Sequence, residues 1–383
     1  MIYADYNGSA PVCTDVKEYL INRLNNGPYS NPNAIHSLGK KMMFGMEKCR
    51  RTIAEMLHCD SSQIYFNSGS SEGISHIFHS ICNSSKDKNI IVTSGIEHSV
   101  VSQACDLYKS QGFKIIEVKT LVDGRVDIND FKNIVSTHKD QISLVSIMAA
   151  NNETGVIQPY KEIGEITKSN GLIFLSDTTQ YIGKTDFNFK ESNIDFAVLS
   201  SHKIGALIGS GLIIAKDPTL LKPFVLGGGQ ERGIRGGTQN YIGIETMTVA
   251  LDSFQRNKHK LKNVKVYKEN FEQNILKKFP EAVVIGKDSP RLASTTMISY
   301  PGIHGQAVQI ELESQDIFVT TSSACSDNEP ETSRILSAMG VANDLGRGVV
   351  RISLCTNATE EIYQAIESAL TKAYNKLQKI KSY

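Results

Sequence analysis

Lys203 is the residue of this sequence best suited to covalent chemistry. It ends the run Ser-Ser-His-Lys at 200–203, directly after the apolar segment 196–199, which is a predicted strand. Lysine is rarely buried without a partner, so packing alone does not explain a lysine at the end of a core strand. A desolvated amine with a lowered pKa can condense with a carbonyl group. Lys203 is therefore a candidate Schiff-base lysine, and the alternative is an exposed loop lysine.

A carboxylate follows a second predicted strand. Asp177 comes directly after residues 172–176, and Gln180 lies three residues further along the chain. An acid at this position can cap the next helix. It can also keep the ring nitrogen of pyridoxal 5'-phosphate (PLP) charged, so that the ring accepts electrons from a substrate. Asp177 and Lys203 together suit this cofactor.

Small polar residues separate a third strand from a helix. The run from Asn67 to Glu72 places Ser70 and Ser71 where the helix is predicted to begin. Backbone N–H groups and hydroxyls there can cradle a phosphate, or they can form a plain N-cap. His98 follows another predicted strand, and such a histidine can stack on a ring, transfer a proton or be structural. These residues are the candidates for a phosphate site and a ring-facing histidine.

The cysteines indicate a reducing compartment. All seven are widely spaced and none forms a C-x-x-C pair, which argues against a disulfide framework and a structural zinc site. Cys325 lies in the small, polar run TTSSACSD at 320–327, where a thiol can be exposed, as a nucleophile must be. The other six cysteines are predicted to fill core or surface positions.

Three further patterns point to other chemistry, and each is incomplete. TTQYIGKT at 178–185 ends like a P-loop but lacks the first glycine, and the glycines at 205, 209 and 211 do not form G-x-G-x-x-G. His76 and His79 lie one helical turn apart without a carboxylate motif, so we expect surface histidines rather than a metal site. Nucleotide hydrolysis, dinucleotide binding and metal chemistry are disfavoured.

The elements that must position these residues alternate between short β-branched runs and amphipathic stretches, which is typical of a parallel α/β sheet. Seven strands are predicted, at 64–67, 90–93, 114–118, 144–148, 172–176, 196–199 and 212–215. Helical periodicity fits residues 72–82, 98–111, 128–135 and 160–169. The reactive edge of such a sheet is the one at the carboxyl ends of its strands.

The pattern changes after residue 241. A polar, lysine-rich stretch through residue 278 predicts a connecting helix. Beyond it, strands are predicted at 282–285, 294–299, 317–320 and 349–354, with helices at 305–313, 331–339 and 359–379. We therefore expect a large α/β domain over residues 13–250. A smaller α+β domain combines residues 1–12 with 251–383.

Charge and composition exclude several classes of protein. Lys and Arg number 41 against 40 Asp and Glu, so the chain offers no general field for nucleic acid or an anionic membrane. The hydrophobic fraction of 40% is ordinary for a globular protein. No signal-peptide pattern and no apolar run of membrane-spanning length occurs, so we expect a cytoplasmic protein with no membrane or direct nucleic-acid partner.

The motifs in their order resemble the PLP-dependent cysteine desulfurases of the NifS and IscS type. They are SSHKIG, Asp177-x-x-Gln180, Glu97-His98, NNETG at 151–155, GGGQERGIRGGTQN at 227–240 and SSAC at 322–325. The resemblance extends from Tyr3 to Leu354. It implies fold type I of the PLP-dependent transferases, class V branch, and a homodimer.

The resemblance also implies roles for individual residues. Lys203 holds PLP, Asp177 pairs with the pyridinium nitrogen, Gln180 bonds the phenolic oxygen, and His98 stacks on the ring and moves protons. The phosphate lies against Ser70, Ser71, Ser200 and His202, with Thr238 reaching it from the partner subunit. Asn152 and Arg351 bind the substrate carboxylate, for which a guanidinium fork is suited. L-cysteine is then converted to L-alanine, with a persulfide left on Cys325 for a sulfur-acceptor protein, in iron–sulfur cluster assembly or tRNA thiolation.

The sequence departs from the family pattern at three places. Asn7-Gly8-Ser9-Ala10-Pro11 replaces the usual Asn-Ala-Thr-Thr-Pro, residues 206–209 replace a Gly-Pro-Lys-Gly turn, and Cys355 stands where glycine is usual. Nearby acids oppose deprotonation of Cys325. Two alternatives stay open: a related enzyme of the same fold, such as a selenocysteine lyase, and a cofactor-bound scaffold without turnover.

Overall fold

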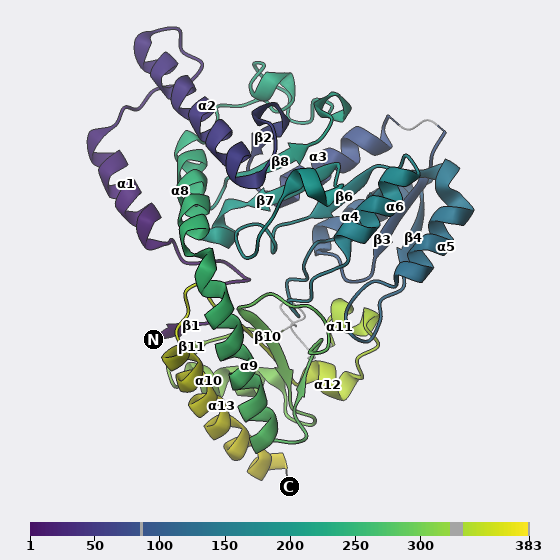
Figure 1. Cartoon of the computed structure of the whole chain (residues 1–383), viewed down its shortest axis with the longest axis vertical. Helices are drawn as coiled ribbons and strands as arrows, with labels where there is room; N and C mark the ends of the chain where they lie inside the picture. Colours follow the sequence, from purple (N-terminus) through teal and green to yellow (C-terminus); the bar gives the residue numbers. More distant parts are fainter. Residues whose placement is uncertain (85–86, 322–331, 382–383) are drawn as a thin grey trace.

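A seven-stranded sheet forms the centre of the computed structural model, which describes residues 1–84, 87–321 and 332–381 (Figure 1). Its strands are β2 (Ile64–Asn67), β3 (Ile90–Ser94), β4 (Lys114–Val118), β5 (Ile142–Ser146), β6 (Phe174–Asp177), β7 (Phe196–Ser200) and β8 (Gly211–Ala215). Their order is β2-β8-β7-β6-β5-β3-β4. β8 runs antiparallel to both of its neighbours, β2 and β7, and the other strand pairs are parallel. The predicted α/β class with a mainly parallel seven-stranded sheet is confirmed.

Helices cover both faces of this sheet, so its strands are apolar on both sides. Every residue of β3, β5, β7 and β8 is buried. Apolar residues of α3 (Ser70–Cys82) and α4 (Ser99–Ser110) pack on one face. The other face is covered by α5 (Ile128–His138), α6 (Tyr160–Ser169), α7 (Phe189–Ser192) and two helices described next.

The sequence reading missed the helices before the first strand of the sheet. They are α1 (Thr14–Asn26) and α2 (Ser37–Leu57), and both pack on α8 (Tyr241–Asn257) (Figure 1). The buried Met42, Met46, Ile53 and Leu57 recur at four- and seven-residue spacing along α2. This is the periodicity of an amphipathic helix, so the signal was present in the sequence.

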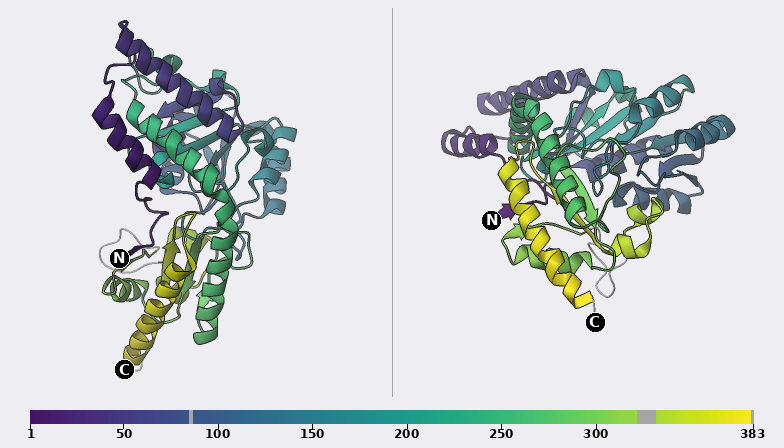
Figure 2. Two further views of the ribbon diagram at one scale, coloured as in Figure 1. Left: turned by 60° about the vertical axis from the view of Figure 1, so that its left-hand side comes forward. Right: turned by 60° about the horizontal axis from the view of Figure 1, so that its bottom comes forward.

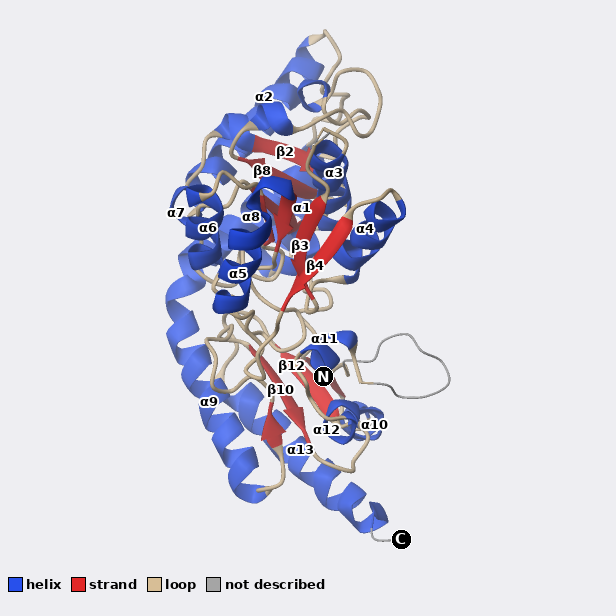
Figure 3. Cartoon of the chain, turned by 90° about the vertical axis from the view of Figure 1, so that its right-hand side faces the viewer, coloured by secondary structure: helices blue, strands red, loops and turns tan. Residues whose placement is uncertain are grey.

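A smaller unit is built around a three-stranded antiparallel sheet of order β12-β10-β9, while β1 pairs with β11 in parallel. Its strands are β1 (Ile2–Tyr3), β9 (Val283–Val284), β10 (Thr295–Ser299), β11 (Ile317–Phe318) and β12 (Val349–Ser353). Its helices are α9 (Leu261–Lys278), α10 (Gly305–Glu313), α11 (Arg334–Ala338), α12 (Asn343–Arg347) and α13 (Glu360–Lys381). Figures 2 and 3 show this unit beside the large sheet, with α9 and α13 along its outside.

One hydrophobic cluster serves the smaller unit and joins the two ends of the chain. It combines Ala4 with apolar residues between 264 and 374. The backbone N–H of Tyr6 donates to Ser353 O at 3.1 Å, and that of Ser353 donates to Ala4 O at 2.8 Å. These contacts support grouping residues 1–12 with the C-terminal part, and the boundary at residue 250 stays a prediction.

Several predicted elements differ from the structure in their bounds. The strand expected at 144–148 is β5 at Ile142–Ser146, and Met148 and Ala150 beyond its end line the pocket described below. The single helix expected over 241–278 is divided into α8 and α9 by a 3-10 turn at Lys258–Lys260. Within the described ranges, no helix combines the length and hydrophobicity required to cross a membrane.

Candidate active site

A cavity of about 240 Å³ opens where β6 and β7 end, between the large sheet and the first residues of the chain. Ten of the twelve residues predicted for the site line it: Ser70, Ser71, His98, Asn152, Asp177, Gln180, Ser200, His202, Lys203 and Arg351. They come from positions up to 281 residues apart in sequence, from 70 to 351. These ten residues therefore lie together in one pocket, and the roles expected for them stay predictions.

Lys203 reaches this cavity because β7 ends in a 3-10 turn, Ser201–Ile204, which closes at Gly205 with φ +84°. Lys203 Nζ donates to Asn7 O at 2.9 Å and to Gly8 O at 2.5 Å. Burial lowers the pKa of Lys203, and the positive charge of Arg351 lowers it further. A larger fraction of neutral amine makes this lysine a better nucleophile and base.

Asp177 is the last residue of β6 and is buried at the pocket floor. Its Oδ1 accepts the backbone N–H of Thr179 at 2.9 Å. Gln180 lies in the same turn, and its Nε2 donates to Asn7 O at 2.9 Å. The strand end therefore fixes a carboxylate and an amide side by side.

Lys184 is a buried lysine behind the pocket that the sequence reading missed. Its Nζ donates to Asn7 Oδ1 at 2.7 Å and, through a very short contact, to Gln180 Oε1. Burial, followed by the charge of Lys203, lowers the pKa of Lys184 well below its usual range. Lys184 thereby orients the Gln180 amide with its NH₂ group turned away from Lys184.

The phosphate candidates meet at the N-terminus of α3. The Ser70 backbone N–H donates to Ser200 Oγ at 2.7 Å, and Ser70 Oγ lies 2.6 Å from Thr179 Oγ1. Gly69 has a φ of +152°, and a Cβ there would lie 3.0 Å from Ser200 Oγ. Ser71 and His202 also line the cavity, and Ser9 Oγ is 3.0 Å from His202 Nδ1. Hydroxyls thus gather at the positive end of a helix.

His98 caps α4 from the opposite side, where its Nδ1 accepts the Val100 N–H at 3.2 Å. The ring is exposed at the cavity opening, yet the protein around it lowers its pKa by desolvation. Directly before it, Glu97 is 1% exposed, and burial raises its pKa to about 8. Glu97 Oε1 accepts bonds from Ser94 Oγ at 2.6 Å and Met148 N at 2.9 Å, which ties the loop before His98 to the end of β5.

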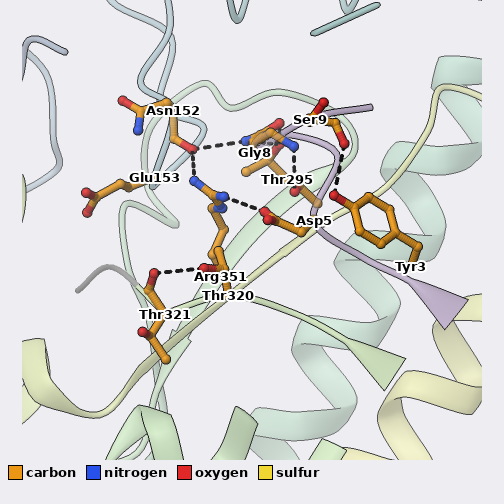
Figure 4. A network of polar contacts seen from close by, with 12 residues as sticks. Tyr3, Asp5, Gly8, Ser9, Asn152, Glu153, Thr295, Thr320, Thr321 and Arg351 are labelled. Atoms are coloured by element: carbon orange, nitrogen blue, oxygen red, sulfur yellow. Dashed lines mark hydrogen bonds and ion pairs between the residues drawn. The ribbon is translucent and has the colours of Figure 1, made fainter. Parts of the chain in front are cut away.

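Arg351 enters the cavity from β12, an outer strand of the three-stranded sheet of the smaller unit (Figure 4). Its Nη1 donates to Asn152 O at 2.9 Å, and its Nη2 forms an ion pair with Asp5 at 2.5 Å. Glu153 lies beside them, and burial raises its pKa to about 7. The sequence reading anticipated Asn152 and Arg351 but not Asp5.

Thr238 and Cys325 are not placed in this cavity. Thr238 is exposed and lines a separate recess with Ser68 and Arg235. Cys325 lies outside the described residues. Cys355, a half-buried thiol, lines a neighbouring cavity of about 490 Å³ that Lys203 also borders.

The expectation that His76 is a surface histidine was wrong. It is 1% exposed, because its Nε2 lies 2.6 Å from Lys222 O and its ring stacks on Phe224 at 5.1 Å. Within the described ranges, no cluster of three or more metal-ligating side chains occurs.

The cavity fits PLP by its donor chemistry. It combines a buried amine, a carboxylate at a strand end and a hydroxyl-rich helix N-terminus, which are the groups expected for an aldehyde, a pyridine nitrogen and a phosphate. Among the described residues, the buried Asn152 Oδ1 and Arg351 Nε have no hydrogen-bond partner. Buried polar atoms without partners in a pocket wall are accounted for by a ligand.

Comparisons with known proteins agree with this chemistry. The aminotransferase class-V family model matches residues 2–365. The chain is 32% identical over 369 residues to a cysteine desulfurase of Nostoc sp., covering 96% of this chain and 91% of the relative. It is 31% identical over 378 residues to the cysteine desulfurase IscS of Clostridium botulinum, covering 97% and 94%.

A solved structure described as a NifS-like protein superimposes with a TM-score of 0.90 at 30% identity, over 98% of this chain and 100% of that one. The two structures therefore share one fold over nearly the whole chain. The chain belongs to the class V aminotransferase family and, within it, to the PLP-dependent cysteine desulfurases of the NifS and IscS type.

Proposed function

We propose that this enzyme removes sulfur from L-cysteine in the cavity between the large sheet and Arg351, leaving L-alanine and a persulfide on Cys325. The observation that carries the proposal is that Lys203 and Arg351 line one cavity from different elements, together with Asp177 and the Ser70 helix end. An amine for the Cα proton and a guanidinium for the carboxylate are the two groups that an α-amino acid substrate requires.

The cofactor is held by residues of the large sheet. Lys203 binds its aldehyde carbon, Asp177 its pyridine nitrogen and Gln180 its phenolic oxygen, while Ser70, Ser71, Ser200 and His202 bind its phosphate. When bound, PLP supplies an electron sink for the bonds at the substrate Cα. His98 lies over the opening, where its lowered pKa leaves the ring neutral and able to accept a proton.

Asn152 and Arg351 bind the substrate carboxylate and thereby orient the amino acid. The neutral form of Lys203, favoured by burial, removes the Cα proton and returns a proton during the reaction. Asn152 Oδ1 and Arg351 Nε have no hydrogen-bond partner within the described residues. They supply the polar contacts at the end of the cavity where the carboxylate binds. The substrate side chain is left free to meet a thiol from outside the cavity.

That thiol is Cys325. Its thiolate attacks the substrate sulfur, an S–S bond forms, the C–S bond breaks, and the electron pair left on carbon is protonated to give L-alanine. The last described residues before the segment support this assignment, because Thr320 pairs with Arg351 through an N–H···O bond of 2.8 Å. Thr321 is the last described residue before Cys325, and the four further residues can carry that thiol at most about 14 Å from it.

The test is the release of L-alanine and sulfide from L-cysteine by the purified, PLP-loaded enzyme in the presence of dithiothreitol, which reduces the persulfide and releases its outer sulfur as sulfide. We expect C325A to lose both products by about 10²-fold or more while its visible cofactor absorbance is unchanged. C355A is the matched control, because that thiol lines the neighbouring cavity and should leave turnover unchanged. Wild-type turnover in C325A would exclude the persulfide route, and a wild-type protein that releases no alanine would be a scaffold.

We infer that the enzyme is a homodimer in which α1 and α2 lie in the interface and Thr238 reaches the partner's phosphate site. These helices expose apolar residues that a water-facing helix does not need: Ile21 at 63%, Leu24 at 60%, Leu38 at 49% and Phe44 at 65%. Light scattering should give the mass of a dimer, and F44D should shift it toward a monomer. The control I310D changes an equally exposed apolar residue on α10. A monomeric wild type would contradict the inference.

The acceptor of the persulfide sulfur is proposed to be a protein that takes the sulfur from Cys325. The setting is proposed to be the reducing cytoplasm, because the six cysteines of the described ranges are all free thiols. Labelling these thiols in freshly lysed cells tests the redox setting.

A further inference from the structure

The guanidinium of Arg351 is already engaged by an acid of the same chain. Arg351 Nη2 and Asp5 Oδ1 are 2.5 Å apart, and Nη1 donates to Asn152 O (Figure 4). The Arg351 side chain is 10% exposed and that of Asp5 is 25% exposed, so solvent screens this pair only in part. Both terminal nitrogens of the fork thus have protein acceptors.

The position of the Asp5 backbone is fixed by the smaller unit. Ala4 N donates to Phe318 O at 2.8 Å, Tyr6 N donates to Ser353 O at 3.1 Å, and Asp5 forms an isolated bridge with Ser353. Ser353 is two residues from Arg351 on β12, so the two side chains start from neighbouring strands. Only rotation of its own side chain can carry the Asp5 carboxylate away from Arg351.

Gly8 provides the space that this carboxylate occupies. A Cβ at position 8 would lie 2.4 Å from Asp5 Oδ2 and 2.9 Å from Asp5 Cγ. The backbone of Gly8 is not among those with positive φ, so alanine is acceptable to the backbone here, and the three atoms nearest to an added Cβ all belong to the Asp5 carboxylate. With any larger residue at position 8, Asp5 would have to turn away.

We propose that Asp5 is an internal competitor for the substrate carboxylate on Arg351, and that Gly8 allows it to be one. The proposal rests on the function proposed above, in which Arg351 binds that carboxylate. One guanidinium fork cannot pair in the same way with two carboxylates, and like charges brought together repel. The substrate must therefore displace Asp5, which weakens the binding of every amino acid that carries a free carboxylate.

The experiment is calorimetric titration of the PLP-loaded enzyme with the product L-alanine and with L-alaninamide, which lacks the carboxylate. We expect D5N to bind L-alanine about fivefold more tightly and L-alaninamide unchanged, as for the loss of a partly exposed ion pair. KM for L-cysteine should fall by a similar factor while kcat stays within about twofold. Weaker or unchanged binding of L-alanine by D5N, or an equal gain for L-alaninamide, would overturn the proposal.

G8A is the second variant, because it keeps the charge of Asp5 and displaces only its position. It should tighten L-alanine binding in the same direction as D5N, and it decides the question if D5N does not fold. Tighter binding of L-alanine by D5N but not by G8A would overturn the role assigned to Gly8.

D252N is the matched control, since it removes the same charge from an exposed ion pair with Arg256 on α8. D252N should bind L-alanine and L-alaninamide as the wild type does. L-alanine binding as tight as that of D5N would overturn the proposal. The titrations do not depend on turnover. Enzyme that binds L-alanine but releases none from L-cysteine would contradict the proposed function and leave this inference standing.

Discussion

The active-site cavity has two walls of different origin. The sheet wall consists of Ser70, Asp177, Ser200 and Lys203, each at a strand end or the helix start that follows one. The chain-end wall consists of Asn7 and Gly8, together with Arg351 from β12, whose guanidinium pairs with Asp5, 346 residues away in sequence. The first wall follows from local pattern, whereas the second exists only because the two ends of the chain share a core.

The two walls also differ in charge. The sheet wall offers hydroxyls, a helix N-terminus and a carboxylate for a cofactor, while the chain-end wall holds Arg351, with Lys184 buried behind it. Asn7 connects them, because its backbone oxygen accepts bonds from both Lys203 and Gln180. Substitutions can therefore weaken each wall separately. The measured quantity that changes then tells whether that wall binds the cofactor or the substrate.

The largest expected effect is on the sheet wall. K203A should reduce turnover of L-cysteine by about 10³-fold or more, because it removes both the cofactor-binding amine and the base. Borohydride reduction of the wild-type enzyme followed by peptide mapping should label Lys203. The control K216A changes a half-exposed lysine paired with Asp195 and should behave as wild type. A label on any other lysine would contradict the assignment.

The next effect is on the chain-end wall. R351Q should reduce kcat/KM by roughly 10²-fold, mostly through KM, since a charge-assisted bond to the substrate carboxylate is worth about 1.5–3 kcal/mol. R351K keeps the positive charge but loses the two-pronged geometry of the guanidinium. Its kcat/KM should therefore lie between those of the wild type and R351Q. PLP binding should be unchanged in both variants, and loss of the cofactor would mean that the walls do not act separately.

The smallest expected effect is on the pH dependence of stability, and it concerns Glu97, the buried acid behind the sheet wall. Burial raises the pKa of Glu97 to about 8 in the folded protein, above the value of about 4.5 in an unfolded chain. The folded state then binds the extra proton, so stability is lost as pH rises from about 4.5 toward 8. E97Q cannot ionise and should lose less stability over this range.

Thermal unfolding of wild type and E97Q at pH 5.5 and pH 8 measures the difference, which we expect to be a few degrees in Tm. The raised pKa of Glu153 acts in the same direction in both proteins and cancels. A larger fall in Tm for E97Q than for wild type would reverse the assignment.

Much of this enzyme was predictable from sequence by local rules. The strands at Ile64–Asn67 and Lys114–Val118 were predicted to the residue, because β-branched runs bounded by turn residues are a short-range signal. Lys203, Asp177 and Ser70 follow such strands, so their gathering at one sheet edge was implied by parallel topology. Arg351 and Asn152 came from the family resemblance, which carries tertiary information that spacing lacks.

What the sequence alone determined was the α/β class, the cofactor chemistry and most residues around it, since these depend on periodicity and on motifs within a few residues of a strand end. Only the tertiary structure decided that Asp5 pairs with Arg351, that Asn7 links Lys203 to Gln180 and Lys184, and that His76 is buried against Phe224. The physical reason is range. A strand can be predicted from neighbouring residues, but an ion pair or a stacked ring depends on which distant segments the packing of the core brings together.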